Sequence, residues 1–394
     1  MKKNIVLIKF LSLVICLSAN AQSAIETTLV EIARNNKTLQ ANRQYWESQR
    51  LLYKAGIVPQ NPTVEYDYLS GSPAGAGNQT EFSVTQSIDF PTAYIKKKQL
   101  SDQQIAQAEF QLVAIRQDIL LKAKKICIEL VYRNKLNAEL TKRKEQADNL
   151  FTNFKIKLDK GAGNILDVNK SQIQLIEIKK EYQENISAIN QLNEKLTALN
   201  GGVQLVFNDT VYFTLPSIPA FEQLEQEFEN SDPLRKIFEQ EKLIALKQVE
   251  VSRSLSLPKI EAGYHYQGIL GQKYNGIHTG ISIPLWENRN TVKLQKAKYL
   301  FADLELEEHR NEHYYEIKQF YAHYQNLKIT LAAYQEVFQT LNSSTLLSKA
   351  LSSGHITSIE YFMEMNYYKG AFINYLNTEK EYYEVIAELY KFTL

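Results

Sequence analysis

Cysteine, proline, glycine and long apolar runs are all scarce in this sequence of 394 residues. Only 2 cysteines occur, and Cys16 lies in a leader-like segment, so Cys127 has no partner for an intrachain disulfide in the mature chain. From 93 to 158 there is no proline or glycine, which permits one very long helix. After the leader, no run reaches the roughly 20 apolar residues of a membrane-spanning helix. Entry into a membrane would therefore need strands.

The N-terminal segment has the pattern of a secretory signal peptide, because lysines precede an apolar run that ends in an A-x-A arrangement at Ala21. We expect residues 1–21 to be removed, and Ile15 is too bulky for lipid attachment at Cys16. The loss of three lysines and no acid takes the formal net charge from +1 to −2. No basic balance dominates, so nucleic acid is not an expected partner.

The mature sequence contains an internal duplication. Equivalent residues recur 193 positions apart in the pairs Pro91 and Pro284, Gly161 and Gly354, and Asp167 and Glu360. A duplicated unit of this length indicates pseudo-symmetric architecture. The expected organisation is a first structural repeat, a linker rich in glycine, proline and β-branched residues, and a second structural repeat, at residues 22–200, 201–219 and 220–394.

Both repeats have the same expected order: a helix, two short strands, a very long helix, a glycine bend and a last helix. The expected ranges are 26–55, 63–69, 81–88, 93–158 and 165–199 in the first repeat, and 221–255, 259–267, 277–283, 288–351 and 357–391 in the second. Apolar residues on the long helices step by three and four, which is typical of a coiled-coil seam. Neighbouring helices must therefore cover these rods. The seam of the second repeat contains Ile317, Phe320, Tyr324, Leu327 and Leu331.

The four strands alternate between an apolar, tyrosine-bearing face and a polar face. In the first, Val64, Tyr66 and Tyr68 point one way and Glu65 and Asp67 the other. This pattern is typical of a transmembrane β-barrel, with lipid outside and water inside, although two soluble hairpins on a core share it. Four strands are too few to close a barrel, so several chains would have to contribute. Other polar-face residues, and candidates for the barrel lumen, are Glu261, His265 and His278.

The order, duplication and spacing of these elements resemble the TolC-like outer membrane efflux proteins, closest to their metal and drug efflux branch. The bend motif "KGAGNILDV", its echo "SGHITSIEY" and the proline-flanked hairpins carry the resemblance over the whole mature chain. It implies a mostly helical α+β homotrimer, in which four strands per chain form a shared twelve-stranded barrel in the outer membrane of a Gram-negative cell. A long α-helical barrel then extends from it into the periplasm.

The resemblance also implies function: a passive exit duct, supplied with small molecules or metal ions by an inner-membrane transporter through a periplasmic adaptor protein. Outer membrane lipid would surround the barrel. The glycines Gly161, Gly163 and Gly354 would form the helical tips, where adaptors dock and the channel closes. Glu360 matches an acid of a charged ring at the aperture, Asp167 is its counterpart, and Met363 stands where relatives have another acid. For both acids the alternative remains that they lie near helix N-termini and complement the helix dipole.

No enzymatic constellation or cofactor site is expected. The stretch "HRNEH", His309 to His313, fits an H-x-x-E-H metalloprotease pattern, but a continuous rod lacks the third ligand and the cleft of a catalytic zinc site. A metal contact between His265 and His278 is a weaker interpretation than two polar lumen residues. The remaining alternative to a channel is a periplasmic coiled-coil scaffold without a pore, which requires the apolar strand faces to be buried.

Overall fold

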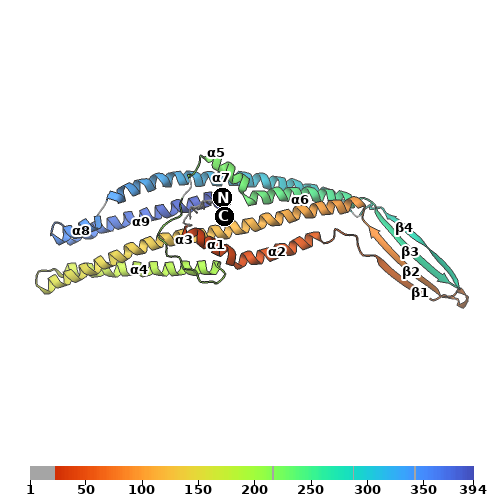
Figure 1. Ribbon diagram of the computed structural model, residues 1–394, viewed down its shortest axis with the longest axis horizontal. Coiled ribbons are helices and arrows are strands. Elements are labelled where there is room, and N and C mark those ends of the chain that lie inside the picture. The colour runs from red at the N-terminus through yellow and green to blue at the C-terminus, as the bar shows by residue number, and fades with distance from the viewer. Residues whose placement is uncertain (1–22, 215–216, 287, 341–342) are drawn as a thin grey trace, which may run out of the picture.

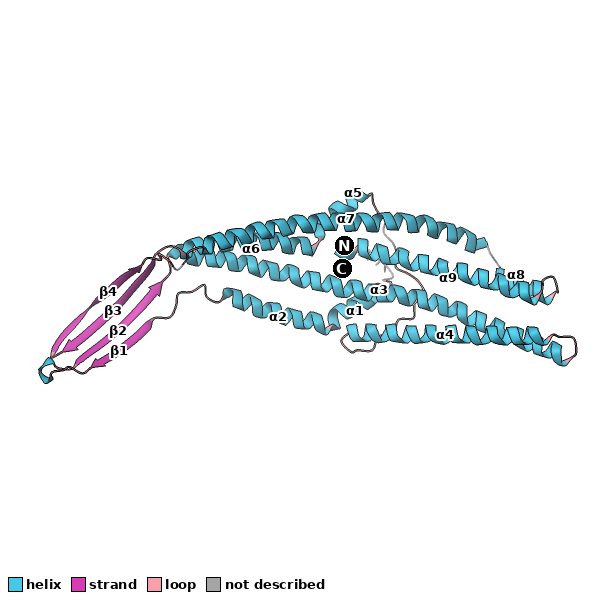
Figure 2. Cartoon of the chain, turned by 180° about the vertical axis from the view of Figure 1, so that it is seen from behind, coloured by secondary structure: helices cyan, strands magenta, loops and turns pink. Residues whose placement is uncertain are grey.

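The computed structural model describes residues 23–214, 217–286, 288–340 and 343–394, so the predicted signal peptide lies outside the described residues. The chain is an elongated helical rod with a β-sheet at one end and two helical hairpin turns at the other (Figures 1 and 2). The C-terminus lies near the middle of the rod (Figure 1). No helix among the described residues has both the length and the apolar character needed to cross a membrane.

The rod is built from helices that run along its length, joined by short caps and turns. They are α1 (Ala24–Asn35), α2 (Lys37–Lys54), α3 (Pro91–Asp159), α4 (Ile165–Leu199), α5 (Phe221–Ser231), α6 (Pro233–Leu255), α7 (Thr291–Thr340), α8 (Ser343–Ser352) and α9 (Ser358–Leu389). Two short 3₁₀ turns, Ala74–Ala76 and Lys391–Thr393, complete the helical elements. At 1.5 Å per residue, the 69 residues of α3 span about 100 Å.

The first helix of each half is broken in two, which corrects the continuous helices expected at 26–55 and 221–255. Asn36 ends α1 and caps α2 by accepting a hydrogen bond from the backbone N–H of Leu39. Asp232 does the same between α5 and α6, accepting from the N–H groups of Leu234 and Arg235. Capping side chains favour the extended backbone that both residues adopt, so each helix ends and restarts at this position.

The long helix of the second half also differs from the expectation. The range 288–351 is described as two helices, α7 and α8, and residues 341 and 342 between them lie outside the described residues. The first-half counterpart, α3, is one uninterrupted helix. The last helices, α4 and α9, run back from the tips beside α3 and α7 (Figure 2).

The four strands form a single antiparallel sheet in the order β1–β2–β3–β4, with bounds Thr63–Leu69, Gln79–Ile88, Lys259–Ile269 and Gln272–Ser282. The central pairing of β2 with β3 joins the two halves of the chain, as in the partners Val84 and Tyr264. A two-residue turn, Leu270 and Gly271, links β3 to β4, and both residues have positive φ, as a tight hairpin turn requires.

The main core lies in the middle of the rod, away from both ends. There the central part of α3 packs with α1, α5, α7 and α9, and aromatic side chains of the inter-half segment cover it. Leu130, Val131 and Ile128 are fully buried. In the same region, Lys135 pairs with Glu379 at 2.7 Å and lies over the ring of Tyr212. The well-packed middle of the rod therefore positions the sheet at one end and the tips at the other.

Candidate functional site

The two helical tips share one turn geometry. Gly161 has φ +74° and Gly354 has φ +72°, in the left-handed region that favours glycine. In the first tip, Gly161 N–H donates to the Leu158 carbonyl at 2.9 Å, and the next N–H, of Ala162, donates to that of Lys157 at 2.9 Å. This is a Schellman motif, which satisfies carbonyls at the helix end.

In the second tip the equivalent bonds are present. Gly354 N–H donates to the Leu351 carbonyl at 3.1 Å, and His355 N–H donates to the Ala350 carbonyl at 2.9 Å. Gly163, in the first tip only, has a separate reason to lack a side chain, since a Cβ there would lie 2.4 Å from the Leu158 nitrogen. Both tips are therefore well-defined turns, each closed by two backbone hydrogen bonds.

Glu360 lies in the first turn of α9 and forms a capping box with Thr357. Its carboxylate accepts from the Thr357 N–H at 2.7 Å and from the hydroxyl at 2.9 Å, and its own N–H donates back to that hydroxyl at 3.2 Å. The backbone N–H of Thr357 lowers the pKa of the Glu360 carboxyl below its ordinary value. The side chain remains exposed, so a capped carboxylate and a charge facing an aperture are compatible.

Asp167 occupies the corresponding first turn of α4, but there Asn164 is the capping residue and accepts from the N–H of Leu166. Met363 is 67% exposed, one turn after Glu360. The sequence reasoning missed Glu364, an exposed acid four residues after Glu360 and therefore on the same helix face. The i, i+4 spacing of the two acids was the available signal.

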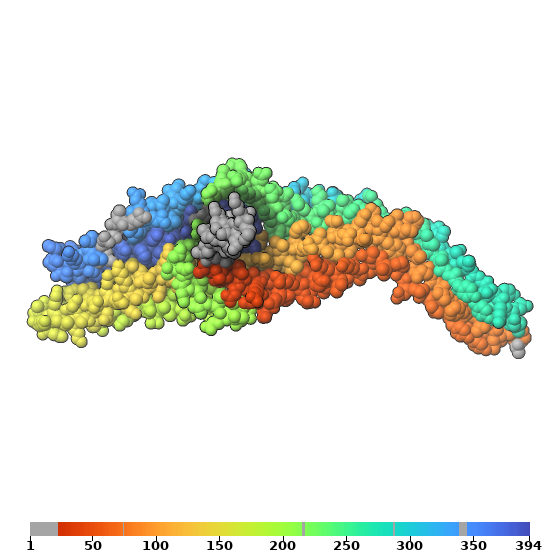
Figure 3. All heavy atoms as spheres, in the orientation of Figure 1, coloured from red at the N-terminus to blue at the C-terminus, as the bar shows by residue number. Residues whose placement is uncertain are grey.

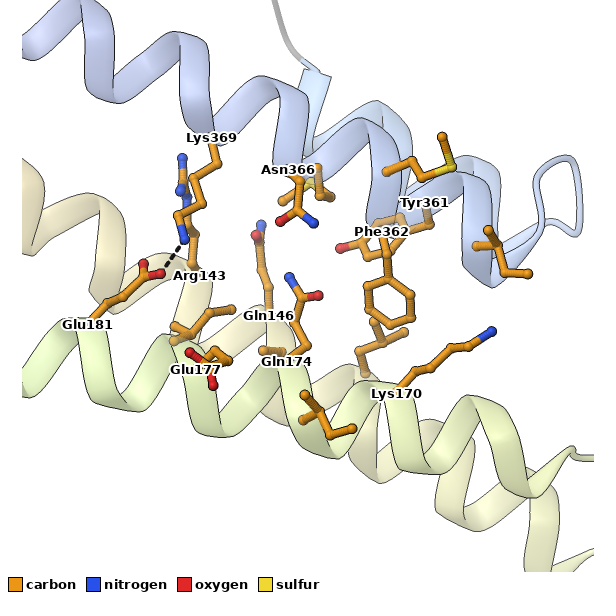
Figure 4. A pocket seen from close by; sticks show the side chains of 17 residues that line it. Arg143, Gln146, Lys170, Gln174, Glu177, Glu181, Tyr361, Phe362, Asn366 and Lys369 are labelled. Carbon is orange, nitrogen blue, oxygen red and sulfur yellow. Dashed lines mark hydrogen bonds and ion pairs between the residues drawn. The ribbon is translucent and has the colours of Figure 1, made fainter.

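A groove of about 590 Å³ lies between the two hairpins near the tips, lined by α3, α4 and α9 (Figure 4). Met363 lines it, and Lys369 on α9 bridges it through an ion pair with Glu181 on α4. The Arg143 side chain is buried at one end. Its Nε donates to Glu139 at 2.7 Å, whereas its two terminal nitrogens find no hydrogen-bond partner among the described residues. The ion pair between Lys369 and Glu181 thus joins the two hairpins across the groove, whereas the bond of Arg143 stays within α3.

The predicted lumen residues share one face of the sheet. Glu65, Ser83 and His265 stand in one cross-strand row, and Asp67 pairs with Glu81 in another. His265 and His278 do not face each other directly, because their partners across β3 and β4 are Gly276 and Gly263, respectively. The pair is diagonal, a separation of about 7–8 Å between backbones.

The opposite, apolar face of the sheet is covered by nothing in the single chain. Val64 is 62% exposed, Tyr66 is 65% exposed and Ile277 is 86% exposed. No helix packs on the strands in Figures 1 and 2, where the sheet extends from the end of the rod. Both sheet edges, β1 and β4, lack a partner strand among the described residues. Exposed apolar strands with unpaired edges strongly favour association with strands of another chain.

The histidines of the "HRNEH" stretch serve the break between α5 and α6. His309 Nε2 lies 3.2 Å from Asp232 Oδ2, and His313 Nε2 lies 3.8 Å from the same oxygen. All three side chains are largely buried, and His313 also packs on the ring of Phe228. Among the described residues, no group of three or more His, Cys, Asp or Glu side chains is arranged to hold a metal ion.

These contacts shift two pKa values. Burial lowers the pKa of His313 below its ordinary 6.5. Burial raises the pKa of Asp232, but the hydrogen bonds from His309 and from two backbone N–H groups outweigh it, so the net shift is downward. Asp232 was missed from the sequence, although an aspartate before Pro233 is a recognisable helix start.

No family model and no curated protein matches the sequence. Solved structures match its fold over almost the whole chain. A membrane protein from Pseudomonas aeruginosa has a TM-score of 0.77 at 15% identity, over 93% of this chain and 89% of that one. The Campylobacter jejuni CmeC outer membrane channel has a TM-score of 0.73 at 14% identity, over 93% and 85%.

The Neisseria gonorrhoeae MtrE outer membrane channel, in its open state, has a TM-score of 0.69 at 12% identity, over 93% of this chain and 88% of that one. At such identities the likeness establishes the fold alone. The chain has the fold of TolC-like outer membrane channels, which confirms the resemblance seen in its sequence.

Proposed function

We propose that this chain is one protomer of an outer membrane exit duct, and that three copies share a twelve-stranded barrel. The observation that carries the proposal is the uncovered apolar face of the four-stranded sheet, together with its two open edges. Edge β4 of one copy can pair with edge β1 of the next, and closure removes every edge. Three sheets of four strands make the number that the resemblance implies.

The rest of the chain fits a duct that continues into the periplasm. The helices extend from the sheet as one elongated rod, and exposed apolar residues along it, such as Leu300, Leu304 and Ile329, require cover from neighbouring copies. The described parts of residues 22–200 and 220–394 each contain, in order, two short helices, two strands, a long helical stretch to a tip and a helix back from it, which supports two structural repeats joined by the linker 201–219. The solved structures that share this fold include outer membrane channels.

The tips are the proposed gate and docking site. The Schellman turns at Gly161 and Gly354 end separate lobes, which Figure 3 shows as two projections at the end opposite the sheet. A periplasmic adaptor that packs against these lobes would spread them, and an inner-membrane transporter would hand over small molecules or metal ions. Glu360, with Asp167 and the newly found Glu364, would line the aperture as exposed or partly exposed acids.

The scaffold alternative requires buried strand faces, and the described strands do not bury them. A matched pair of substitutions on β4 separates the two functions. Ile277→Arg places a charge on the apolar face, at a cost of about 2–4 kcal/mol at the centre of a bilayer. His278→Arg places the same charge on the next residue, which faces the other side.

We expect wild-type protein to insert into planar bilayers and give stepwise conductance. The Ile277→Arg variant should fail to insert, whereas His278→Arg should insert with altered ion selectivity. Wild-type protein that gives no conductance, or two variants that insert equally well, would remove the channel and favour the scaffold.

A further inference from the structure

Basic residues gather where the helices meet the sheet. Helices α3, α6 and α7 run side by side and all reach the sheet at this level (Figures 1 and 2). Within about two helical turns of the strands, these helices and the residues that join them to the sheet carry a set of lysines and arginines, here called the basic girdle: Lys96, Lys97, Lys98, Arg253, Lys259, Arg289, Lys293, Lys296 and Lys298. The acids in the same segments are Asp89, Glu250 and Glu287.

The girdle is assembled by contacts between its helices. Lys96 on α3 pairs with Glu250 on α6 at 2.9 Å. The side chain of Asn288, next to Arg289, donates to the Leu255 carbonyl at the end of α6 at 2.8 Å. Segments far apart in the sequence therefore present their charges at one level of the molecule.

Six of the nine girdle residues have no ion-pair or hydrogen-bond partner among the described residues. Lys96 and Lys97 have carboxylate partners, the latter Asp89 at 2.9 Å. A second group is exposed, and its side chains form no ion pair or hydrogen bond with the part of the chain that the structure describes: Lys98, Arg253, Arg289, Lys293, Lys296 and Lys298.

The N-termini of two helices contribute to the positive charge at the girdle. Both α3 and α7 begin at the girdle, and neither has an acid in its first turn. The N-terminus of a helix carries a partial positive charge, so basic residues there repel it. The N-termini of α3 and α7 and the girdle side chains add to one positive field, which suits an external anion, whereas Arg253 lies in the last turn of α6 and complements the C-terminus of that helix.

The depth of the girdle matches a membrane surface. Strands of 10 or 11 residues, as in β2, β3 and β4, cross a hydrocarbon core. Lys98 lies seven residues after the start of α3, so at 1.5 Å per residue it stands about 10 Å beyond the strands, near a headgroup layer. Exposed Leu285 and Trp286, 77% exposed in the latter case, lie between sheet and girdle, as aromatic side chains do at membrane interfaces.

We propose that the basic girdle binds the phosphates of anionic phospholipids in the leaflet that faces the helices, and so fixes how deeply the barrel sits. This inference rests on the proposed function, because it needs the sheet to lie in a bilayer. Lysine and arginine side chains reach from apolar surroundings to phosphates, and each near an anionic surface strengthens binding. At the other end of the sheet, Lys273 is the only basic residue in or beside the turns. The uneven positive charge therefore distinguishes one leaflet from the other.

The test measures the association of spin-labelled phosphatidylglycerol and phosphatidylcholine with the full mature protein in vesicles that contain both lipids. We expect wild-type protein to prefer phosphatidylglycerol, and 1 M salt to weaken that preference. The variant Lys293→Gln/Lys296→Gln/Lys298→Gln should lower it by about fivefold or more. Free glycerol phosphate should not compete, which separates a lipid surface from a soluble phosphate.

The matched control is Lys155→Gln/Lys157→Gln/Lys160→Gln, which removes the same charge from exposed positions at the first tip. It should keep the wild-type preference. An absent preference in wild type, an unchanged preference in the girdle variant, or an equal loss in the control would overturn the inference. Flotation with the vesicles distinguishes the two proposals: protein that floats without lipid preference contradicts only the girdle, and protein that never floats contradicts the channel as well.

Discussion

The two helical hairpins end in the same turn but are held very differently. Near the first tip, buried apolar side chains come from both helices, with Phe154 and Ala147 on α3 and Val168 and Leu175 on α4. Near the second tip, α9 buries Tyr361 and Met365, whereas α8 buries no side chain among those described. The same type of turn therefore ends a well-packed hairpin, α3 and α4, and a weakly packed one, α8 and α9.

This difference predicts which segments would move if the chain gates at its tips. Segments with few buried contacts open at lower free energy than packed ones. In a duct that gates at its tips, α8 and the start of α9 are the segments expected to shift, with α3 and α4 as the fixed frame.

The largest contrast should come from side-chain truncation. Leu130→Ala, at a fully buried site in the middle of α3, should lower the free energy of unfolding by about 2–5 kcal/mol. Leu346→Ala on α8, at a side chain 62% exposed, should change it by less than about 0.5 kcal/mol. Denaturant unfolding in detergent measures both, and similar losses at the two sites would contradict the unequal anchoring.

Substitution of the tip glycines should have equal effects in both hairpins, since the turns are equivalent. A Cβ at Gly161 or Gly354 meets nothing within 4 Å, so alanine adds only left-handed strain, about 1–2 kcal/mol. Gly163→Ala should cost more, because its Cβ would collide with the Leu158 backbone. Thermal unfolding of the three variants checks the order, and a harmless Gly163→Ala would show that the first turn is looser than described.

Acidification should loosen the break between α5 and α6. Burial lowers the folded pKa of His313 below 6.5, so the folded chain binds fewer protons there than the unfolded chain. The contribution to stability is therefore full above pH 6.5 and is lost as pH falls below that value. The apparent Tm of wild type should drop between pH 7 and pH 5, and His313→Gln should flatten the slope.

His323→Gln is the control for this titration, because His323 is exposed on the same helix. Its pH dependence should match that of wild type. A slope that survives His313→Gln would place the sensitive group elsewhere.

The smallest expected effect concerns the aperture acids. Glu360→Ala combined with Asp167→Ala should raise single-channel conductance in planar bilayers, as fewer charges constrict the opening. Glu360→Gln separates two roles, because glutamine retains the capping box and loses the charge. If Glu360→Gln with Asp167→Asn raises conductance equally, charge is responsible; if only the alanine pair does, the helix cap is.

Glu194→Ala and Glu307→Ala, at exposed acids away from the tips, are the controls and should leave conductance unchanged. An unchanged conductance in all the tip variants would remove Glu360 and Asp167 from the gate.

Local patterns predicted much of this fold and little of its assembly. Period-two alternation gave the strands, but β4 begins at Gln272, five residues before its expected start, because the stretch "QKYN" is polar on both faces. The pairing of β2 with β3 joins segments more than 170 residues apart, which no local pattern reports. The breaks at Asn36 and Asp232 were missed because apolar periodicity continues across them.

The candidate site divides in the same way. Gly161 and Gly354 could be found because left-handed turns demand glycine. The capping role of Glu360 follows from its spacing of three residues from Thr357, so it could have been predicted from the sequence. The contacts of Asp232 with His309 and His313 depend on how α6 and α7 pack, so only the structure brings them together.

The association state of the mature chain, measured by native mass spectrometry after detergent extraction and again in detergent-free buffer, tests the central claim most directly. The account predicts a homotrimer in detergent and aggregation or loss of the folded chain without it, because the uncovered strands need lipid or detergent. A folded, stable monomer in plain buffer would contradict it.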